Sequence, residues 1–427
     1  AARGAAAFLT EEVLPEVSLP QIQVSDARRA LATVSRRFFG CPDQEIALIG
    51  VTGTNGKTTT SQLCAHLLRP AFRETASMGT LGVFLGSEKI EEGEYTTDLA
   101  HVQNRRLRRL ADSGVGAAAM EVSSHALTLD RVAELRFRVA IFTNLARDHL
   151  DFHGSAEAYA EAKRKLFREL PANGIAAINA DDQAAASFAE ACSARVISYS
   201  ADGLESAEVR AEEIELSPRE TRFCLTAGGR KFAVVSPLIG RFQVDNILAA
   251  ATVVFGLGLD LEAALERLAS FLPVPGRMEK TALPNGATAV IDFAHNPDGL
   301  ANLLLNCRRL AEGRIHLVFG CGGDRDRGKR AIMGHIAAKG TDVCWVTSDN
   351  PRTENPERIA ADILKSFNGA SSAPRVELDR EMAIRKAYAE TRAGDLLVVA
   401  GKGHERYQLI GTRKIPFCDR EVLGRCN

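Results

Sequence analysis

The sequence predicts an α/β protein with mostly parallel sheets, divided into two or three domains. Short apolar runs alternate with helical patterns almost throughout, which favours parallel strands joined by crossover helices. The 427 residues are too many for a single hydrophobic core. Two prolines and a glycine fall within residues 272–276 and the alternation restarts after them, so we place a linker there.

Composition and charge are those of a globular enzyme. Hydrophobic residues make up 45% and charged residues 25%. With 53 basic and 54 acidic residues the net charge is −1, and no apolar run approaches the roughly 20 residues of a membrane span. We therefore expect neither nucleic acid nor membrane as a partner. The nine cysteines include no C-x-x-C pair, which indicates free thiols in a reducing cytoplasm and argues against a zinc site built from cysteines.

The first clear strand, residues 46–49, runs into a glycine-rich turn that is typical of a phosphate-binding loop. Residues 50–60 read Gly-Val-Thr-Gly-Thr-Asn-Gly-Lys-Thr-Thr-Thr, and a helix is expected over residues 58–68. The loop departs from the usual spacing at one position, where Val51 stands in place of a glycine.

Four residues of this loop have a chemical reason to be there. Gly53 and Gly56 let backbone N–H groups approach phosphate oxygens. Lys57 can reach the β- and γ-phosphates, and the hydroxyl of Thr58 can hold Mg²⁺. The following helix adds the positive end of its dipole, so the loop predicts use of a nucleoside triphosphate.

The remaining elements follow in two series. Before the linker we expect strands at 116–122, 138–143, 175–178 and 195–199, helices at 156–170, 246–255 and 261–271, and a small antiparallel hairpin region at 208–236. After it we expect strands at 288–292, 315–319, 343–347 and 396–400, with helices at 297–309 and 359–365. The second series predicts a doubly wound domain whose ligands bind beyond the carboxyl ends of its strands.

Two groups of polar residues follow strands of the first series. Glu121 ends a strand of buried character, where a carboxylate suits a metal cation, or alternatively caps the next helix. Two histidines and two aspartates crowd residues 143–154. Because Mg²⁺ prefers oxygen ligands, His149 would be an unusual magnesium ligand, and a zinc site or a network at a helix start fits the spacing equally well.

Three polar loops follow strands of the second series. Residues 320–330 are glycine-rich and basic, 349–352 read Asp-Asn-Pro-Arg, and 401–405 read Gly-Lys-Gly-His-Glu. The first of these loops, taken alone, could be a solvated charge run. Three at the ends of three strands of one domain predict a single crevice, suited to carboxylate or phosphate groups.

Taken together, these segments resemble the Mur ligases of peptidoglycan synthesis, most closely the members that add 2,6-diaminopimelate. The matching segments occur in the family's order at 53–59, 96–98, 121–127, 144–154, 159–167, 275–279, 292–297, 320–326, 349–352 and 401–405. The resemblance implies three domains: a largely missing uridine-binding domain (1–24), a central ATP-binding domain (25–274) and a C-terminal Rossmann-like, amino-acid-binding domain (275–427). It also implies a cytoplasmic enzyme, which we expect to be a monomer.

The resemblance implies a two-step ligation. ATP would phosphorylate the free carboxylate of UDP-N-acetylmuramoyl-L-alanyl-D-glutamate, and the amine of meso-diaminopimelate would attack the acyl phosphate. The implied catalytic residues are Lys57, Glu121, His149 and Lys163. The implied magnesium ligands are Thr58, Glu121, His149 and Lys163, the last as a carbamate. Without the resemblance, Lys163 reads as an ordinary exposed helix lysine.

The same resemblance implies three binding sets. ATP would contact Gly53, Thr54, Asn55, Gly56, Lys57, Thr58, Thr59, Asn246, Arg277, Asp292 and His295. The UDP-linked substrate would contact Thr96, Thr97, Ser123 and Arg131, next to Asp98, which replaces an expected proline. The amino acid would contact Arg325, Asp349, Asn350, Arg352, Gly401 and Glu405, with Arg352 on its distal carboxylate and Glu405 on its distal ammonium.

Three other functions remain as alternatives. An L-lysine-adding Mur ligase would lack the arginine of the 349–352 segment. A folylpolyglutamate synthetase-like ligase does not account for the segments at 121–125 and 349–352. A catalytically inactive scaffold homologue fits a shortened first domain, but Lys57, Glu121, His149 and Lys163 argue against it.

Overall fold

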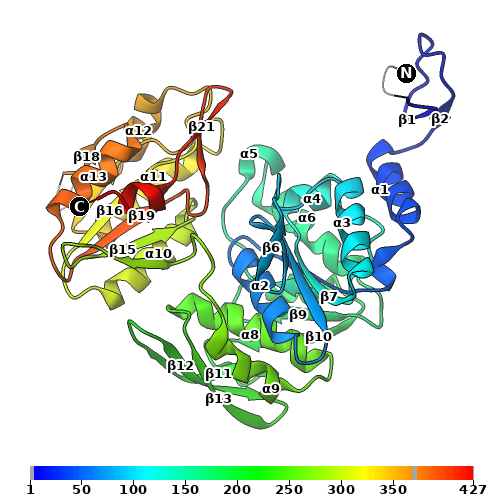
Figure 1. Ribbon diagram of the computed structural model, residues 1–427, viewed down its shortest axis with the longest axis horizontal. Coiled ribbons are helices and arrows are strands. Elements are labelled where there is room, and N and C mark those ends of the chain that lie inside the picture. Colours follow the sequence, from blue (N-terminus) through cyan, green and yellow to red (C-terminus); the bar gives the residue numbers. More distant parts are fainter. Residues whose placement is uncertain (1–3, 368–372, 427) are drawn as a thin grey trace.

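The computed structural model describes residues 4–367 and 373–426, so the first three residues of the expected N-terminal remnant lie outside the description. A two-stranded parallel sheet, β1 (Phe8–Thr10) and β2 (Gln21–Gln23), stands apart from the main body in Figure 1. Helix α1 (Ala27–Phe38) and the turn η1 (Pro42–Gln44) connect it to a large central sheet.

The central sheet has eleven strands in the order β13-β12-β11-β10-β9-β8-β3-β7-β4-β5-β6. Its seven central strands are parallel, and antiparallel strands extend both edges. The strands are β3 (Ala47–Thr52), β4 (Glu74–Gly79), β5 (Gly82–Leu85), β6 (Glu88–Glu91), β7 (Val115–Glu121), β8 (Val139–Phe142), β9 (Ile175–Asn179), β10 (Arg195–Ser200), β11 (Val209–Leu216), β12 (Thr221–Ala227) and β13 (Arg230–Ser236). The antiparallel character predicted for 208–236 is confirmed, but these strands continue the main sheet because β11 pairs with β10.

Helices cover both faces of this sheet. They are α2 (Lys57–Leu67), α3 (Ala100–Asp112), α4 (Ser124–Thr128), α5 (Leu150–His153), α6 (Ala156–Arg168), α7 (Ala185–Glu190), α8 (Arg241–Gly256) and α9 (Leu261–Glu266), with the turn η2 (Arg267–Ser270). Side chains alternate along β3: Ile49 packs in the core that holds α2 and α8, and Leu48 in the core that holds α3 and α6. The helix predicted at 261–271 is wrong in its second half, which is a 3₁₀ turn.

The C-terminal sheet forms a second lobe in Figure 1, with strand order β14-β15-β19-β16-β17-β18. Its strands are β14 (Glu279–Ala282), β15 (Thr288–Asp292), β16 (Ile315–Phe319), β17 (Val343–Val346), β18 (Arg375–Val376) and β19 (Leu396–Ala400), followed by the hairpin β20 (Tyr407–Ile410) and β21 (Arg413–Pro416). Its helices are α10 (Pro297–Leu310), α11 (Gly328–Gly340), α12 (Pro356–Leu364), α13 (Arg380–Glu390) and α14 (Asp419–Leu423). The parallel strands β15, β19, β16 and β17 have cores on both faces, which confirms the doubly wound prediction.

Candidate active site

The glycine-rich loop lies between β3 and α2, and two of its positions exclude any side chain. Gly53 and Gly56 have φ angles of 149° and 85°. A Cβ on Gly53 would lie 1.9 Å from Thr143 Oγ1, and one on Gly56 would lie 2.5 Å from Asn246 Oδ1. The loop is therefore a close-fitting cradle at the start of a helix, which suits a phosphate group.

Two lysines converge on this cradle. Lys57 folds back and donates to the carbonyls of Gly53 and Thr54 at 2.9 and 2.8 Å. Lys163 reaches it from α6, over the ring of Tyr159. The alternative of an exposed Lys163 is wrong, since only 1% of this residue is exposed. Burial, and then the charge of Lys57, hold the pKa of Lys163 well below its ordinary value.

Glu121 is the carboxylate at the floor of the site. Its Oε2 accepts from Thr58 Oγ1 at 3.0 Å and from Thr80 Oγ1 at 3.1 Å, and its Oε1 accepts from the Thr80 N–H at 2.8 Å. The capping alternative is wrong, because Ser123 caps α4. A buried carboxylate beside a hydroxyl is an oxygen donor set that fits Mg²⁺.

Asp148 joins the central sheet to the C-terminal lobe. Its Oδ2 lies 3.8 Å from His149 Nε2 and 3.5 Å from His295 Nε2, and accepts from Asn296 Nδ2 at 3.2 Å. Burial opposes its ionisation, but the His295 hydrogen bond and nearby positive charges keep its pKa well below the usual value. Burial lowers the pKa of His149 to about 3. Among the described residues, no three or more histidine, cysteine or acidic side chains are arranged to hold a metal, so the zinc alternative finds no support.

The four residues predicted to contact the UDP-linked substrate lie around the end of β7. Thr97 Oγ1 donates to the carbonyl of Glu121 at 2.8 Å and accepts from the Ser123 N–H at 3.1 Å. Arg131 donates to the carbonyl of Thr97 at 2.9 Å, and Thr96 Oγ1 lies within hydrogen-bond distance of Thr80 Oγ1, at 3.0 Å.

Asp98, at the position where proline was expected, has a local structural partner. Its carboxylate pairs with Arg106 of α3, and their side chains are 4% and 7% exposed. A buried pair of this kind ties the loop to the helix and accounts for the substitution.

The residues predicted to contact the nucleotide, except Gly53, line a cavity of about 570 Å³ between the two lobes. Arg277 donates to Thr58 Oγ1 at 3.0 Å and lies over the ring of Phe293. Asp292 accepts from the N–H groups of Met278 and Ala294 at 2.7 and 2.8 Å, so it holds the turn that carries Arg277. Both lobes therefore contribute to the cavity, and their relative position decides its shape.

The three polar loops of the C-terminal lobe meet at the carboxyl ends of β16, β17 and β19. Asn350 Nδ2 donates to Glu405 Oε2 at 2.9 Å, and Arg352 donates to the carbonyl of Gly323 at 2.8 Å. A Cβ on Gly401 would lie 2.5 Å from Asp349 Oδ2, so only glycine fits there.

Arg325 lies nearer the opposite lobe, 3.7 Å from Asp151 Oδ2. Arg325 nevertheless interacts electrostatically with Arg352. The pKa of Arg352 is lowered, first by burial and then by the charge of Arg325. The crevice therefore carries two guanidinium groups, one of which contacts the central lobe.

Sequence reasoning missed four residues of the site. They are Thr80, Asp148, Tyr159 and Lys402. Asp148, Tyr159 and Lys402 lie within segments already singled out, so burial was the missing information. Thr80 carried no signal at all.

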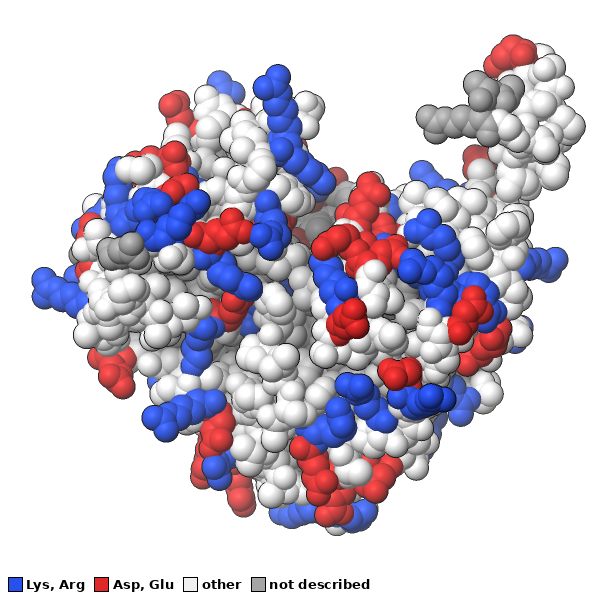
Figure 2. Space-filling view, viewed as in Figure 1, with Lys and Arg blue, Asp and Glu red and all other residues white. Residues whose placement is uncertain are grey.

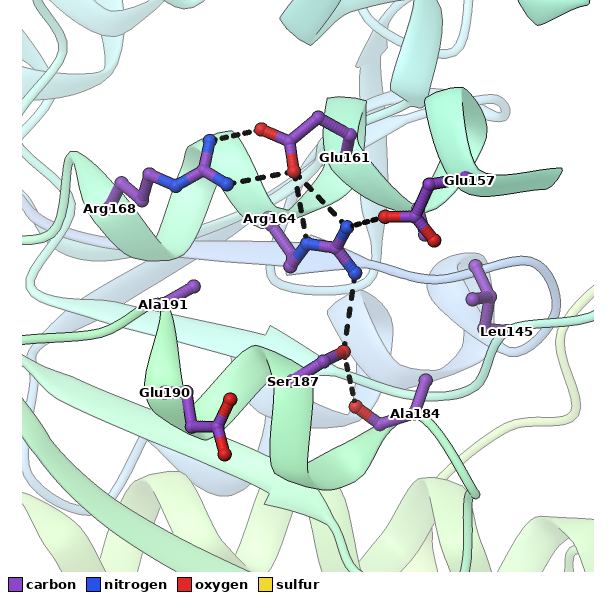
Figure 3. Close-up of a pocket in the computed structure, with 10 residues that line it drawn as sticks. Leu145, Glu157, Glu161, Arg164, Arg168, Ala184, Ser187, Glu190 and Ala191 are labelled. Atoms are coloured by element: carbon purple, nitrogen blue, oxygen red, sulfur yellow. Dashed lines mark hydrogen bonds and ion pairs between the residues drawn. The ribbon is translucent and has the colours of Figure 1, made fainter. Parts of the chain in front are cut away.

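A second hollow of about 670 Å³ lies between α6 and α7 (Figure 3). Its arginines are engaged by glutamates of their own helix: Arg164 pairs with Glu157 and Glu161, and Arg168 pairs with Glu161. On the face drawn in Figure 2, basic and acidic side chains are likewise interspersed. We assign no function to this hollow.

The phosphate loop, the Glu121–Thr58 pair and the cavity shared by two lobes define a nucleotide-dependent enzyme. Two family profiles match the chain: Mur ligase middle domain over residues 51–254, and Mur ligase, glutamate ligase domain over residues 276–403. The chain belongs to the Mur ligase family.

Individual relatives agree with this assignment. The UDP-N-acetylmuramoyl-L-alanyl-D-glutamate–2,6-diaminopimelate ligase of Gloeobacter violaceus is 45% identical over 95% of this chain and 82% of its own length. The ligase of the same name from Geobacillus kaustophilus is 40% identical over 99% of this chain and 86% of its own length. A solved structure of such a ligase is 35% identical, with a TM-score of 0.68 over 100% of this chain and 87% of that chain.

A folylpolyglutamate synthase of Mycobacterium tuberculosis shares the fold alone. It is 20% identical, with a TM-score of 0.73 over 87% of this chain and 92% of that chain. Within the described parts of the chain, none of the helices has the length and apolar character needed to cross a membrane.

Proposed function

We propose that this chain is an ATP-dependent, ADP-forming ligase that joins UDP-N-acetylmuramoyl-L-alanyl-D-glutamate to meso-2,6-diaminopimelate, in peptidoglycan precursor synthesis. One observation carries the proposal: the central lobe of this Mur ligase chain has a phosphate cradle, and the C-terminal lobe has a crevice with two arginines, of which Arg325 contacts the central lobe. Its relatives are named as ligases of this reaction. We further propose that it acts as a monomer in the cytoplasm, with domains at 1–24, 25–274 and 275–427.

In the first step the substrate carboxylate attacks the γ-phosphorus of ATP, and ADP leaves. The chain contributes positioning and positive charge to this transfer. The charges of Lys57, in the loop, and of Arg277, which donates to Thr58, suit the phosphates. Residues Thr96, Thr97, Ser123 and Arg131 around the end of β7 would place the UDP-linked carboxylate beside them.

Magnesium would be held by Thr58 and Glu121, and a second ion by His149 together with Lys163 as a carbamate. When bound, Mg²⁺ neutralises phosphate charge. The fit rests on the oxygens of Glu121 and Thr58, 3.0 Å apart.

Carbamylation of Lys163 is chemically reasonable in this position. A depressed pKa favours the neutral amine, whose nitrogen bonds to the carbon of CO₂ while one proton leaves. The product is an anion in place of a cation, which removes the repulsion between Lys163 and Lys57.

In the second step the amine of the incoming amino acid attacks the carbonyl carbon of the acyl phosphate. The tetrahedral intermediate collapses to the amide as the carbon–oxygen bond to phosphate breaks, phosphate leaves and the nitrogen gives up one proton. In this proposal the crevice of the C-terminal lobe holds the far end of the amino acid, with Arg352 on its carboxylate and Glu405 on its ammonium. Closure of the two lobes would bring amine and acyl phosphate together.

The test is release of phosphate and ADP from ATP, with and without the UDP-dipeptide and diaminopimelate. We expect turnover only with both substrates, and a product heavier by one diaminopimelate residue in mass spectrometry. Turnover with L-lysine instead, or with a folate and glutamate, would support the corresponding alternative ligase. An absence of turnover with all of these by the folded protein would support a scaffold function.

A further inference from the structure

Lys402 is a fully buried lysine beneath the amino-acid crevice. Its side chain is 0% exposed, and its ammonium donates to Asn350 Oδ1 at 3.0 Å and to Glu405 Oε2 at 2.7 Å. Burial of an ammonium is costly unless acceptors surround it. The position therefore depends on these two acceptors, and they depend on the lysine.

The lysine fixes which way the Asn350 amide faces. Because an ammonium can only donate hydrogen bonds, the amide oxygen must face Lys402. That oxygen also accepts from the Leu409 N–H at 2.8 Å, while the amide nitrogen donates to Glu405 Oε2 at 2.9 Å. A flipped amide would lose all three contacts.

The same contacts give the two oxygens of Glu405 different environments. Oε2 accepts from both Lys402 and Asn350. Over the residues that the structure describes, no hydrogen bond reaches Oε1. One oxygen is therefore anchored inward, and the other is available to a cationic ligand.

We propose that Lys402 is a positioning residue that holds Glu405 for the distal ammonium of the amino-acid substrate. This inference rests on the proposed function. Arg352, whose charge is near that of Glu405, acts on the distal carboxylate. The distal ammonium and the distal carboxylate are thus bound by separate groups, Glu405 and Arg352. Lys402 supports only the binding of the ammonium.

Three amino acids separate these two contributions. Diaminopimelate has both distal groups, 2-aminopimelate lacks the distal ammonium, and L-lysine lacks the distal carboxylate. We would measure kcat/KM for each with the wild type, Lys402→Met and the control Lys386→Met, a solvent-accessible lysine of α13. We expect Lys402→Met to lose about 10-fold or more of the preference for diaminopimelate over 2-aminopimelate, the effect of one hydrogen bond to a charged group. Its preference over L-lysine and its KM for ATP should not change, and Lys386→Met should match the wild type.

Two results for Lys402→Met would overturn the inference. One is an unchanged preference for diaminopimelate over 2-aminopimelate. The other is an equal loss of the preferences over 2-aminopimelate and over L-lysine, which would indicate collapse of the crevice. If Lys402→Met does not fold, Glu405→Gln takes its place, and it must lose the same preference while keeping that over L-lysine. If the wild type ligates diaminopimelate and Lys402→Met has the same preferences as the wild type, only the role of Lys402 is refuted. A wild type that ligates none of the three refutes the proposed function instead.

Discussion

Lys57 and Lys163 donate to the same atom, the carbonyl oxygen of Gly53, at 2.9 and 2.7 Å. They come from α2 and α6, so the fold brings two lysine side-chain nitrogens to one acceptor. Burial lowers the pKa of both lysines, and Lys57 lowers that of Lys163 further. Conversion of Lys163 to an anion would relieve this repulsion, which leads to the first prediction.

Lys163→Ala should lose about 10²-fold or more of its ligation rate, because it would remove the carbamate proposed to hold a magnesium ion near the phosphate site. Formate or acetate should restore part of the rate by occupying the vacated space. The measurement is ADP release with increasing carboxylate, with Lys165→Ala of the same helix as the control. A fully active Lys163→Ala protein would contradict the carbamate.

Lys57→Ala should reduce ligation by about 10²–10³-fold, the typical cost of losing one electrostatic contact to the transition state. The fold should persist, because among the described residues the Lys57 ammonium bonds only to carbonyls of its own loop. Thermal unfolding and ADP release would be measured on the same preparation. Near-normal turnover in the folded variant would rule out the phosphate-loop assignment.

Arg352→Ala should weaken use of diaminopimelate and leave L-lysine almost unaffected. A site built around a guanidinium discriminates against a substrate that leaves it unpaired. The wild type should therefore prefer diaminopimelate by a large factor in kcat/KM, and the variant should not. Comparable kcat/KM values for both amino acids in the wild type would refute this specificity while leaving the ligase assignment intact.

Arg380→Ala should destabilise the C-terminal lobe by about 3–5 kcal/mol, the usual effect of removing one partner of a buried ion pair. Arg380 and Asp419 are both 0% exposed, with Nε and Oδ1 2.8 Å apart, and they join α13 to α14. Denaturant unfolding would measure the loss. The double variant Arg380→Met/Asp419→Leu should recover much of it, since no unpaired charge remains buried. A double variant no more stable than Arg380→Ala would contradict this account.

The sequence by itself determined the features that depend on neighbouring residues. The phosphate loop was predicted because glycine, lysine and threonine act within one turn between a strand and a helix. The strands at 288–292, 315–319 and 396–400 were predicted because a parallel strand covered on both faces is a continuous apolar run. The use of a nucleoside triphosphate and the position of the C-terminal crevice were predicted from these features, whereas ATP itself was implied by the family resemblance.

Only the tertiary structure decided the contacts between distant segments. Thr80 reaches Glu121 across 41 residues, Lys402 reaches Asn350 across 52, and Asp148 reaches Asn296 across 148. The edge strand β6 also escaped prediction, because its exposed, charged residues carry no apolar pattern. The roles of the individual site residues stay predictions. Local chemistry identifies what a residue can do, but burial and charge pairing depend on which segments the fold brings together, and these decide what it does.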